Sequence, residues 1–70
     1  MKVTITRETA ERNIKSTIAG YKNDVCEFNE GLVVGFLVTY YQAGLFTQDE
    51  VNQILSDNGF DTIDFNEQED

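Results

Sequence analysis

Several residue types that small proteins use for chemistry or for added stability are scarce in this 70-residue chain. It contains no histidine, proline or tryptophan, and Cys26 is its single cysteine. One cysteine excludes a disulfide within the monomer, and the lack of histidine argues against a zinc site. Because Cys26 has no histidine that could activate it as a nucleophile, we expect it to be a small core residue.

Basic residues are absent from most of the chain. All five lie within the first 22 positions: Lys2, Arg7, Arg12, Lys15 and Lys22. Residues 23–70 carry 11 acidic residues and a net charge of −11, whereas residues 1–22 have +3 and the whole chain −8. A charge of this sign and size disfavours direct contact with nucleic acid or with an anionic membrane. The distribution suggests a protein that presents an acidic surface to a partner.

The length of the chain allows one domain with a small stability margin, because a protein of this size buries only about 60% of its unfolded surface. Its composition, 40% hydrophobic and 11% aromatic, is sufficient for a core. We assign residues 1–65 to a single helical domain and residues 66–70 to a flexible acidic tail. The lone cysteine suits a reducing compartment, and no apolar stretch typical of a signal peptide follows the first charges. We therefore expect a cytoplasmic protein.

The longest uncharged stretch, residues 31–48, requires a comparison with membrane helices. It contains Gly31 and Gly35 at a spacing that is common in pairs of membrane helices. A membrane span needs about 20 mostly apolar residues, whereas the second half of this stretch is polar. We therefore interpret it as a buried core helix, in which the two glycines admit a neighbouring helix of the same chain or of a second copy.

The third helix has the clearest boundaries and is predicted at residues 48–58. Thr47, with Glu50 three residues later, has the form of a capping box at the start of a helix. At the other end, Gly59 suits the left-handed position of a Schellman ending, and Phe60 is placed to contact the last turn of the helix.

The central helix is predicted to end in the same way, with Gly44 in the left-handed position. Its start is open to two interpretations, because both Asp24, which a glutamate follows three residues later, and Asn29 are candidate N-caps. Residues 33–41 are also rich in β-branched and aromatic side chains, which is typical of a strand. We favour a helix because the four-residue link that begins at Gly44 matches the ends of two capped helices.

The first helix is predicted to begin after Thr6 and to end near residue 21. Its apolar positions recur at spacings of three and four, which places them on one helical face. These positions are Ala10, Ile14, Ile18, Tyr21 and Val25.

Both ends of the chain show an alternation of apolar and polar residues. Val3 and Ile5 provide it at the start, and Ile63 and Phe65 provide it near the end. Such alternation is typical of strands, so the two terminal segments can form a short two-stranded ribbon. The predicted fold class is mainly α, a compact three-helix domain to which this ribbon is an optional addition.

We predict a partner-binding surface made of acidic residues and one tyrosine. Tyr40 and Tyr41 point about 100° apart on a helix, so one of them, which we take to be Tyr41, should lie near the surface. Capping explains the acids at helix starts, whereas no local structure explains those of residues 57–70, which therefore carry most of the prediction. The predicted surface comprises Asp57, Asp61, Asp64, Glu67, Glu69, Asp70, Asp24, Glu27, Glu30 and Tyr41.

No pattern in the chain indicates catalysis or metal binding. An EF-hand loop that began at Asp57 would place Thr62 where the loop requires glycine, so the calcium-site register fails. Close pairs of carboxylates are unavoidable with 13 acidic residues in so short a chain. We expect no catalytic residue, no metal and no cofactor.

These observations predict a small, non-enzymatic binding protein. It would block a basic, nucleic-acid-binding surface of a partner protein by acting as a DNA mimic, because carboxylates can occupy sites that await phosphates. The profile is similar in general character to phage inhibitors such as anti-restriction and anti-CRISPR proteins, although no specific motif carries this similarity. The alternative is a small structural or regulatory homodimer that assembles through the central helix. A charged face that only keeps the protein in solution is the simplest interpretation of such acids.

Overall fold

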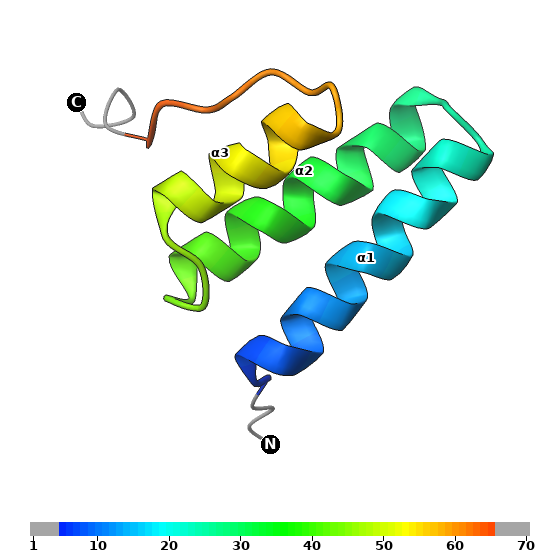
Figure 1. Cartoon of the computed structure of the whole chain (residues 1–70). Helices are drawn as coiled ribbons and strands as arrows, with labels where there is room; N and C mark the ends of the chain where they lie inside the picture. Colours follow the sequence, from blue (N-terminus) through cyan, green and yellow to red (C-terminus); the bar gives the residue numbers. More distant parts are fainter. Residues whose placement is uncertain (1–4, 66–70) are drawn as a thin grey trace.

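Three helices follow one another along residues 5–65, the part of the chain that the computed structural model describes. They are α1 (Arg7–Asn23), α2 (Glu27–Gln42) and α3 (Gln48–Asp57). Figure 1 shows α2 between α1 and α3, with each helix running opposite to the one before it. The principal-axis extents are 32 × 30 × 19 Å, so the molecule is thinner in one direction than in the other two. The predicted mainly α, three-helix domain is confirmed, and the strand interpretation of residues 33–41 is wrong.

The N-terminal boundaries of α1 and α3 follow local capping signals in the sequence. Thr6 is the N-cap of α1, and its hydroxyl accepts a hydrogen bond from the backbone N–H of Thr9 at 3.2 Å. The predicted capping box of α3 is present: Thr47 Oγ1 accepts from the N–H of Glu50 at 3.1 Å, and a Glu50 carboxylate oxygen accepts from the N–H of Thr47 at 2.8 Å. These bonds satisfy N–H groups that a helix start leaves without partners.

Both predicted Schellman endings are confirmed. Gly44 and Gly59 each have a φ of +82°, in the left-handed region that side chains disfavour. After α2, the N–H of Leu45 donates to the carbonyl of Tyr40 at 2.9 Å, and the N–H of Phe60 makes the equivalent bond after α3 at the same distance.

The core follows one stripe of α2, to which the flanking helices add side chains. Val33, Leu37 and Tyr40 lie four and three residues apart, so they share that stripe and are buried. The Tyr40 hydroxyl accepts a hydrogen bond from Asn13 Nδ2 at 2.7 Å, which satisfies the polar end of a buried ring. The buried residues are Ala10, Ile14, Val33, Leu37, Tyr40, Phe46, Val51 and Leu55.

The corner between α1 and α2 differs from the prediction. α1 extends beyond residue 21, and the backbone N–H of Asp24 caps it by donating to two carbonyls of its last turn. The N-cap of α2 is Cys26, and the side chain of Asn29 donates to the Asp24 carbonyl at 2.8 Å, so both predicted N-caps are wrong. Val25 and Cys26 turn the chain and are exposed, which overturns their assignment to the core.

The predicted ribbon is absent from the described residues, and a side chain takes the place of its second strand. The N–H of Ile63 donates to Asn52 Oδ1 at 2.7 Å, and the Ile63 carbonyl accepts from Asn52 Nδ2 at 2.8 Å. The Asn52 amide therefore satisfies both backbone groups that a neighbouring strand would pair. Val3 and the predicted tail, residues 66–70, lie outside the described residues.

The glycines offer a matched test of this backbone. We expect Gly44→Ala to lower the free energy of unfolding by about 1–2 kcal/mol, because alanine is strained at a φ of +82°. Gly35→Ala should raise it by about 0.5–1 kcal/mol, because the added Cβ improves helix propensity and meets no atom within 4 Å. Urea unfolding of both variants provides the measurement. Changes of the same sign at the two positions would contradict this account.

Candidate partner-binding surface

Three parts of the chain meet at one end of the molecule: the last turn of α1, the first turn of α2 and the segment after α3 (Figure 1). The rings of Tyr21 and Phe60 pack together with 4.9 Å between their centroids, and this contact joins the end of α1 to the segment after α3. Lys22, in the last turn of α1, contributes a positive charge here. These parts of the chain and the last turn of α3 carry five exposed acidic residues, which we call the acidic end: Asp24, Glu27, Glu30, Asp57 and Asp61.

Asp64 and Tyr41, the other described residues of the predicted surface, do not join the acidic end. Phe65 stacks on Tyr41 with 4.0 Å between ring centroids, so the segment after Phe60 runs toward the C-terminal end of α2. Asp64 precedes this contact and is exposed, whereas Tyr41 is half-buried and has one ring face against Phe65. The last three predicted residues lie outside the described residues: Glu67, Glu69 and Asp70.

The arginines of α1 are paired with acids elsewhere on the molecule. Arg7 forms ion pairs with two glutamates, and Arg12 Nη2 lies 3.6 Å from Glu8 Oε2. Within residues 5–65, no carboxylate of the acidic end takes part in an ion pair. Asp57 accepts a hydrogen bond from the neutral side chain of Gln53 at 2.7 Å, and it forms no ion pair with Lys15, which lines the same groove. The negative charge of the acidic end is therefore available to an external partner.

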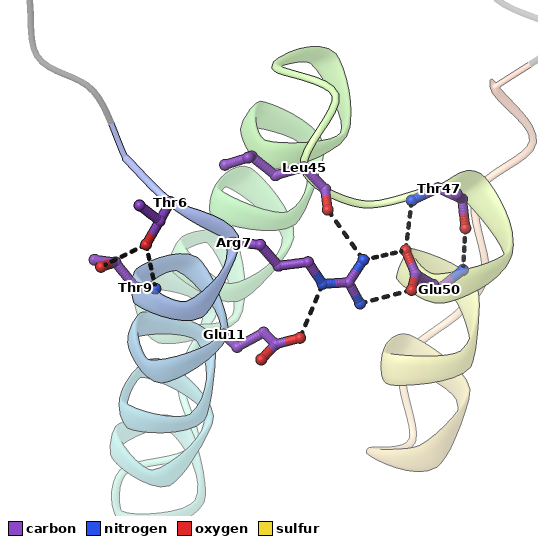
Figure 2. Close-up of polar contacts among 7 residues, drawn as sticks. All are labelled: Thr6, Arg7, Thr9, Glu11, Leu45, Thr47 and Glu50. Atoms are coloured by element: carbon purple, nitrogen blue, oxygen red, sulfur yellow. Dashed lines mark hydrogen bonds and ion pairs between the residues drawn. The ribbon is translucent and has the colours of Figure 1, made fainter.

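Arg7 joins the first turn of α1 to the first turn of α3, as Figure 2 shows. Its guanidinium forms a bidentate pair with Glu50 at 2.6 and 3.0 Å, and it donates to Glu11 at 2.9 Å and to the Leu45 carbonyl at 3.3 Å. The same Glu50 carboxylate closes the capping box with Thr47. The hydrogen bonds from Arg7, and secondly from the Thr47 N–H, lower the pKa of Glu50 to about 2, and the pairing raises the pKa of Arg7.

Apolar side chains that the sequence analysis did not identify lie beside the acidic end. Val25 and Phe28 are 68% and 74% exposed, and Leu32 is 37% exposed. Gly31 and Gly35 are also exposed, and a Cβ on either would meet no atom within 4 Å, so the described residues place no neighbouring helix against them. We call Phe28, Gly31, Leu32 and Gly35 the bare face of α2. Their helical offset from the core stripe is the sequence signal that could have revealed this face.

An open groove of about 420 Å³ separates α1 from α3. Its volume suits a small ligand. However, no polar or charged side chain of residues 5–65 is buried, so the groove presents no desolvated group for chemistry. The residues that line it are Glu11, Ile14, Lys15, Ile18, Phe46, Ile54, Asp57 and Asn58.

Comparisons with known proteins assign no family to the chain. Searches of protein-family models, of curated proteins and of solved structures find no match. In the described part of the chain, no cluster of three or more His, Cys, Asp or Glu could hold a metal ion. No helix formed by these residues is long and apolar enough to cross a membrane.

Acid titration should reveal the pairing of Glu50. A carboxylate with a pKa of about 2 in the folded state and 4.5 otherwise stabilises the fold above about pH 4.5, and this contribution is lost as the pH falls toward 2. We expect Glu50→Gln to unfold at a lower temperature than the wild type at pH 7, with the gap shrinking between pH 4.5 and 2. Glu8→Gln, which removes the same charge from a looser ion pair, should show a smaller gap. A gap for Glu50→Gln that is independent of pH would contradict the assignment.

Asn52 should control the segment that carries Asp61 and Asp64. We expect Asn52→Ala to release residues 61–65, because the side chain bonds both backbone groups of Ile63. Amide hydrogen exchange should accelerate at Ile63 and its neighbours, while exchange in α2 stays slow. Gln53→Ala is the matched control, since Gln53 bonds only the side chain of Asp57. Equal exchange in the two variants would show that Asn52 does not hold this segment.

Proposed function

We propose that this protein is a non-enzymatic binding protein whose acidic end covers a basic, nucleic-acid-binding surface of a partner protein. The carboxylates would take the place of phosphates among lysine and arginine side chains of the partner. Charge complementarity of this kind accelerates association and makes it sensitive to salt. The partner class remains the one that the sequence predicts, a basic protein that handles nucleic acid.

One observation carries this proposal. The five carboxylates of the acidic end come from three separate segments, and within residues 5–65 none is in an ion pair, whereas Arg7 and Arg12 are paired with other acids. Capping does not account for Asp24, whose backbone, and not its side chain, closes α1. These observations support a binding surface that includes the corner before α2 as well as the segment after α3.

The bare face of α2 supports a second candidate function, a homodimer that assembles through this helix. Phe28 and Leu32 expose apolar surface, and the two glycines leave room for close approach of another helix backbone. Sedimentation over a concentration series separates this candidate from the first. Dimerisation that Phe28→Ser abolishes would favour it, and a monomer at high concentration would exclude it.

The proposal predicts salt-sensitive capture that duplex DNA competes away. Immobilised protein should retain a basic partner from an extract of its host, and both raised salt and added duplex DNA should release that partner. Replacing the five acids of the acidic end by Asn or Gln should weaken binding by at least about fivefold, because five exposed charge pairs at about 0.2–1 kcal/mol each amount to at least about 1 kcal/mol. Titration of the purified partner with both forms of the protein measures the difference.

Asp49→Asn combined with Glu8→Gln serves as the control for this experiment, since both acids are exposed and belong to other parts of the surface. These substitutions should change partner binding by less than about threefold. Retention that is indifferent to salt, or unchanged in the neutralised variant, would overturn the electrostatic proposal. If salt but not duplex DNA releases the partner, the acidic end binds a basic surface of the partner that lies outside its nucleic-acid-binding site.

A further inference from the structure

The bare face of α2 is apolar surface that the fold leaves exposed. Phe28, which is 74% exposed, and Leu32, which is 37% exposed, lie one helical turn apart and point away from the core stripe. Val25, 68% exposed, extends the apolar surface to the corner before the helix. Large apolar side chains that are exposed together mark interaction sites more often than single scattered ones do.

The glycines determine the shape of this face. Gly31 lies between Phe28 and Leu32 in the sequence, and Gly35 follows Leu32. A Cβ added at either glycine would meet no atom within 4 Å. Glycine in a helix interior is unfavourable, and packing within residues 5–65 does not compensate for it. The result is a shallow surface beside Phe28 that the backbone of another helix can approach closely.

The charges around this face indicate which kind of helix can bind there. Asp24, Glu27 and Glu30 border Val25 and Phe28 in sequence and are exposed, and no ion pair with another described residue neutralises them. A second copy would bring a chain of net charge −8 against the same acids, which is repulsive. A helix with one apolar face and flanking Lys or Arg matches both the apolar surface and its acidic border.

We propose that the bare face of α2, together with Val25, binds a basic amphipathic helix of the partner, with Phe28 as the anchoring side chain. This inference rests on the proposed function and specifies which element of the basic partner is recognised. The apolar anchor provides the dehydrated centre of the contact, and the surrounding carboxylates pair with cations at its rim.

A synthetic peptide tests the inference without knowledge of the partner. The probe is a helical peptide of about 18 residues, or five turns, with Leu along one face and Lys elsewhere. A scrambled peptide of the same composition keeps the charge and removes the apolar face. In ¹⁵N-labelled protein we expect the Leu/Lys peptide to shift the amide signals of residues 25–35 and to bind at least tenfold more tightly than the scrambled peptide, about 1.4 kcal/mol.

Phe28→Ser should abolish this preference between the two peptides and leave the fold intact, because its side chain is exposed. Ile5→Ser is the matched control: Ile5 is an apolar residue, 41% exposed, that precedes α1, and its replacement should leave the preference unchanged. Gly35→Ala should weaken binding of the Leu/Lys peptide, although the substitution stabilises α2. That pairing of a more stable fold with weaker binding distinguishes a docking role from a structural one.

The outcomes separate this inference from the proposed function. Equal binding of the two peptides, or equal preference in wild type and Phe28→Ser, would overturn the docking site and leave salt-sensitive capture through the acidic end standing. Concentration-dependent dimerisation that Phe28→Ser abolishes would assign the face to a second copy and also overturn it. If neutralising the acidic end leaves partner capture unchanged, the proposed function itself fails, whatever the peptides do.

Discussion

The whole structure depends on the burial of a single stripe of α2 against two helices at once. Val33, Leu37 and Tyr40 occupy this stripe, and α1 and α3 lie on either side of α2 (Figure 1). Two neighbouring helices cover only part of the circumference of α2. For this reason α2, although apolar over most of its circumference, retains an exposed face with Phe28 and Leu32. The core and the candidate docking surface thus have the same origin.

The charged side chains are likewise divided between those that hold the helices together and those that remain at the surface. Arg7 contacts Glu50, Glu11 and the Leu45 carbonyl, so one side chain fastens the first turn of α1 to the first turn of α3 (Figure 2). This use of Arg7 leaves two lysines of α1 close to the acidic end: Lys22 in the last turn of α1, and Lys15, which lines the same groove as Asp57. The strong net charge therefore does not spread evenly. Negative charge is concentrated at the acidic end, whose carboxylates form no ion pair within residues 5–65.

Sequence reasoning succeeded where the deciding atoms lie within a few residues of one another. The capping box of Thr47 and Glu50 and the left-handed glycines 44 and 59 were predicted because each closes a ring of local hydrogen bonds. It failed at Asp24, where two local motifs competed. Asp24 has the form of an N-cap for α2, but its backbone N–H bonds the last turn of α1, and Cys26 is the N-cap of α2.

By itself, the sequence determined three helices, the N-cap at Thr6, the capping box at Thr47, the endings at Gly44 and Gly59, and the confinement of basic residues to the first 22 positions. These properties depend on residue type and on short-range periodicity, both of which can be read along the chain. Only the tertiary structure decided that Asn52 binds Ile63, that Gly31 and Gly35 face solvent and that the start of α2 and the segment after α3, which both carry acidic residues, lie at one end. Each of these depends on which helix faces meet. An amphipathic pattern predicts a buried face but does not specify the element that covers it, because many partners can bury the same apolar area.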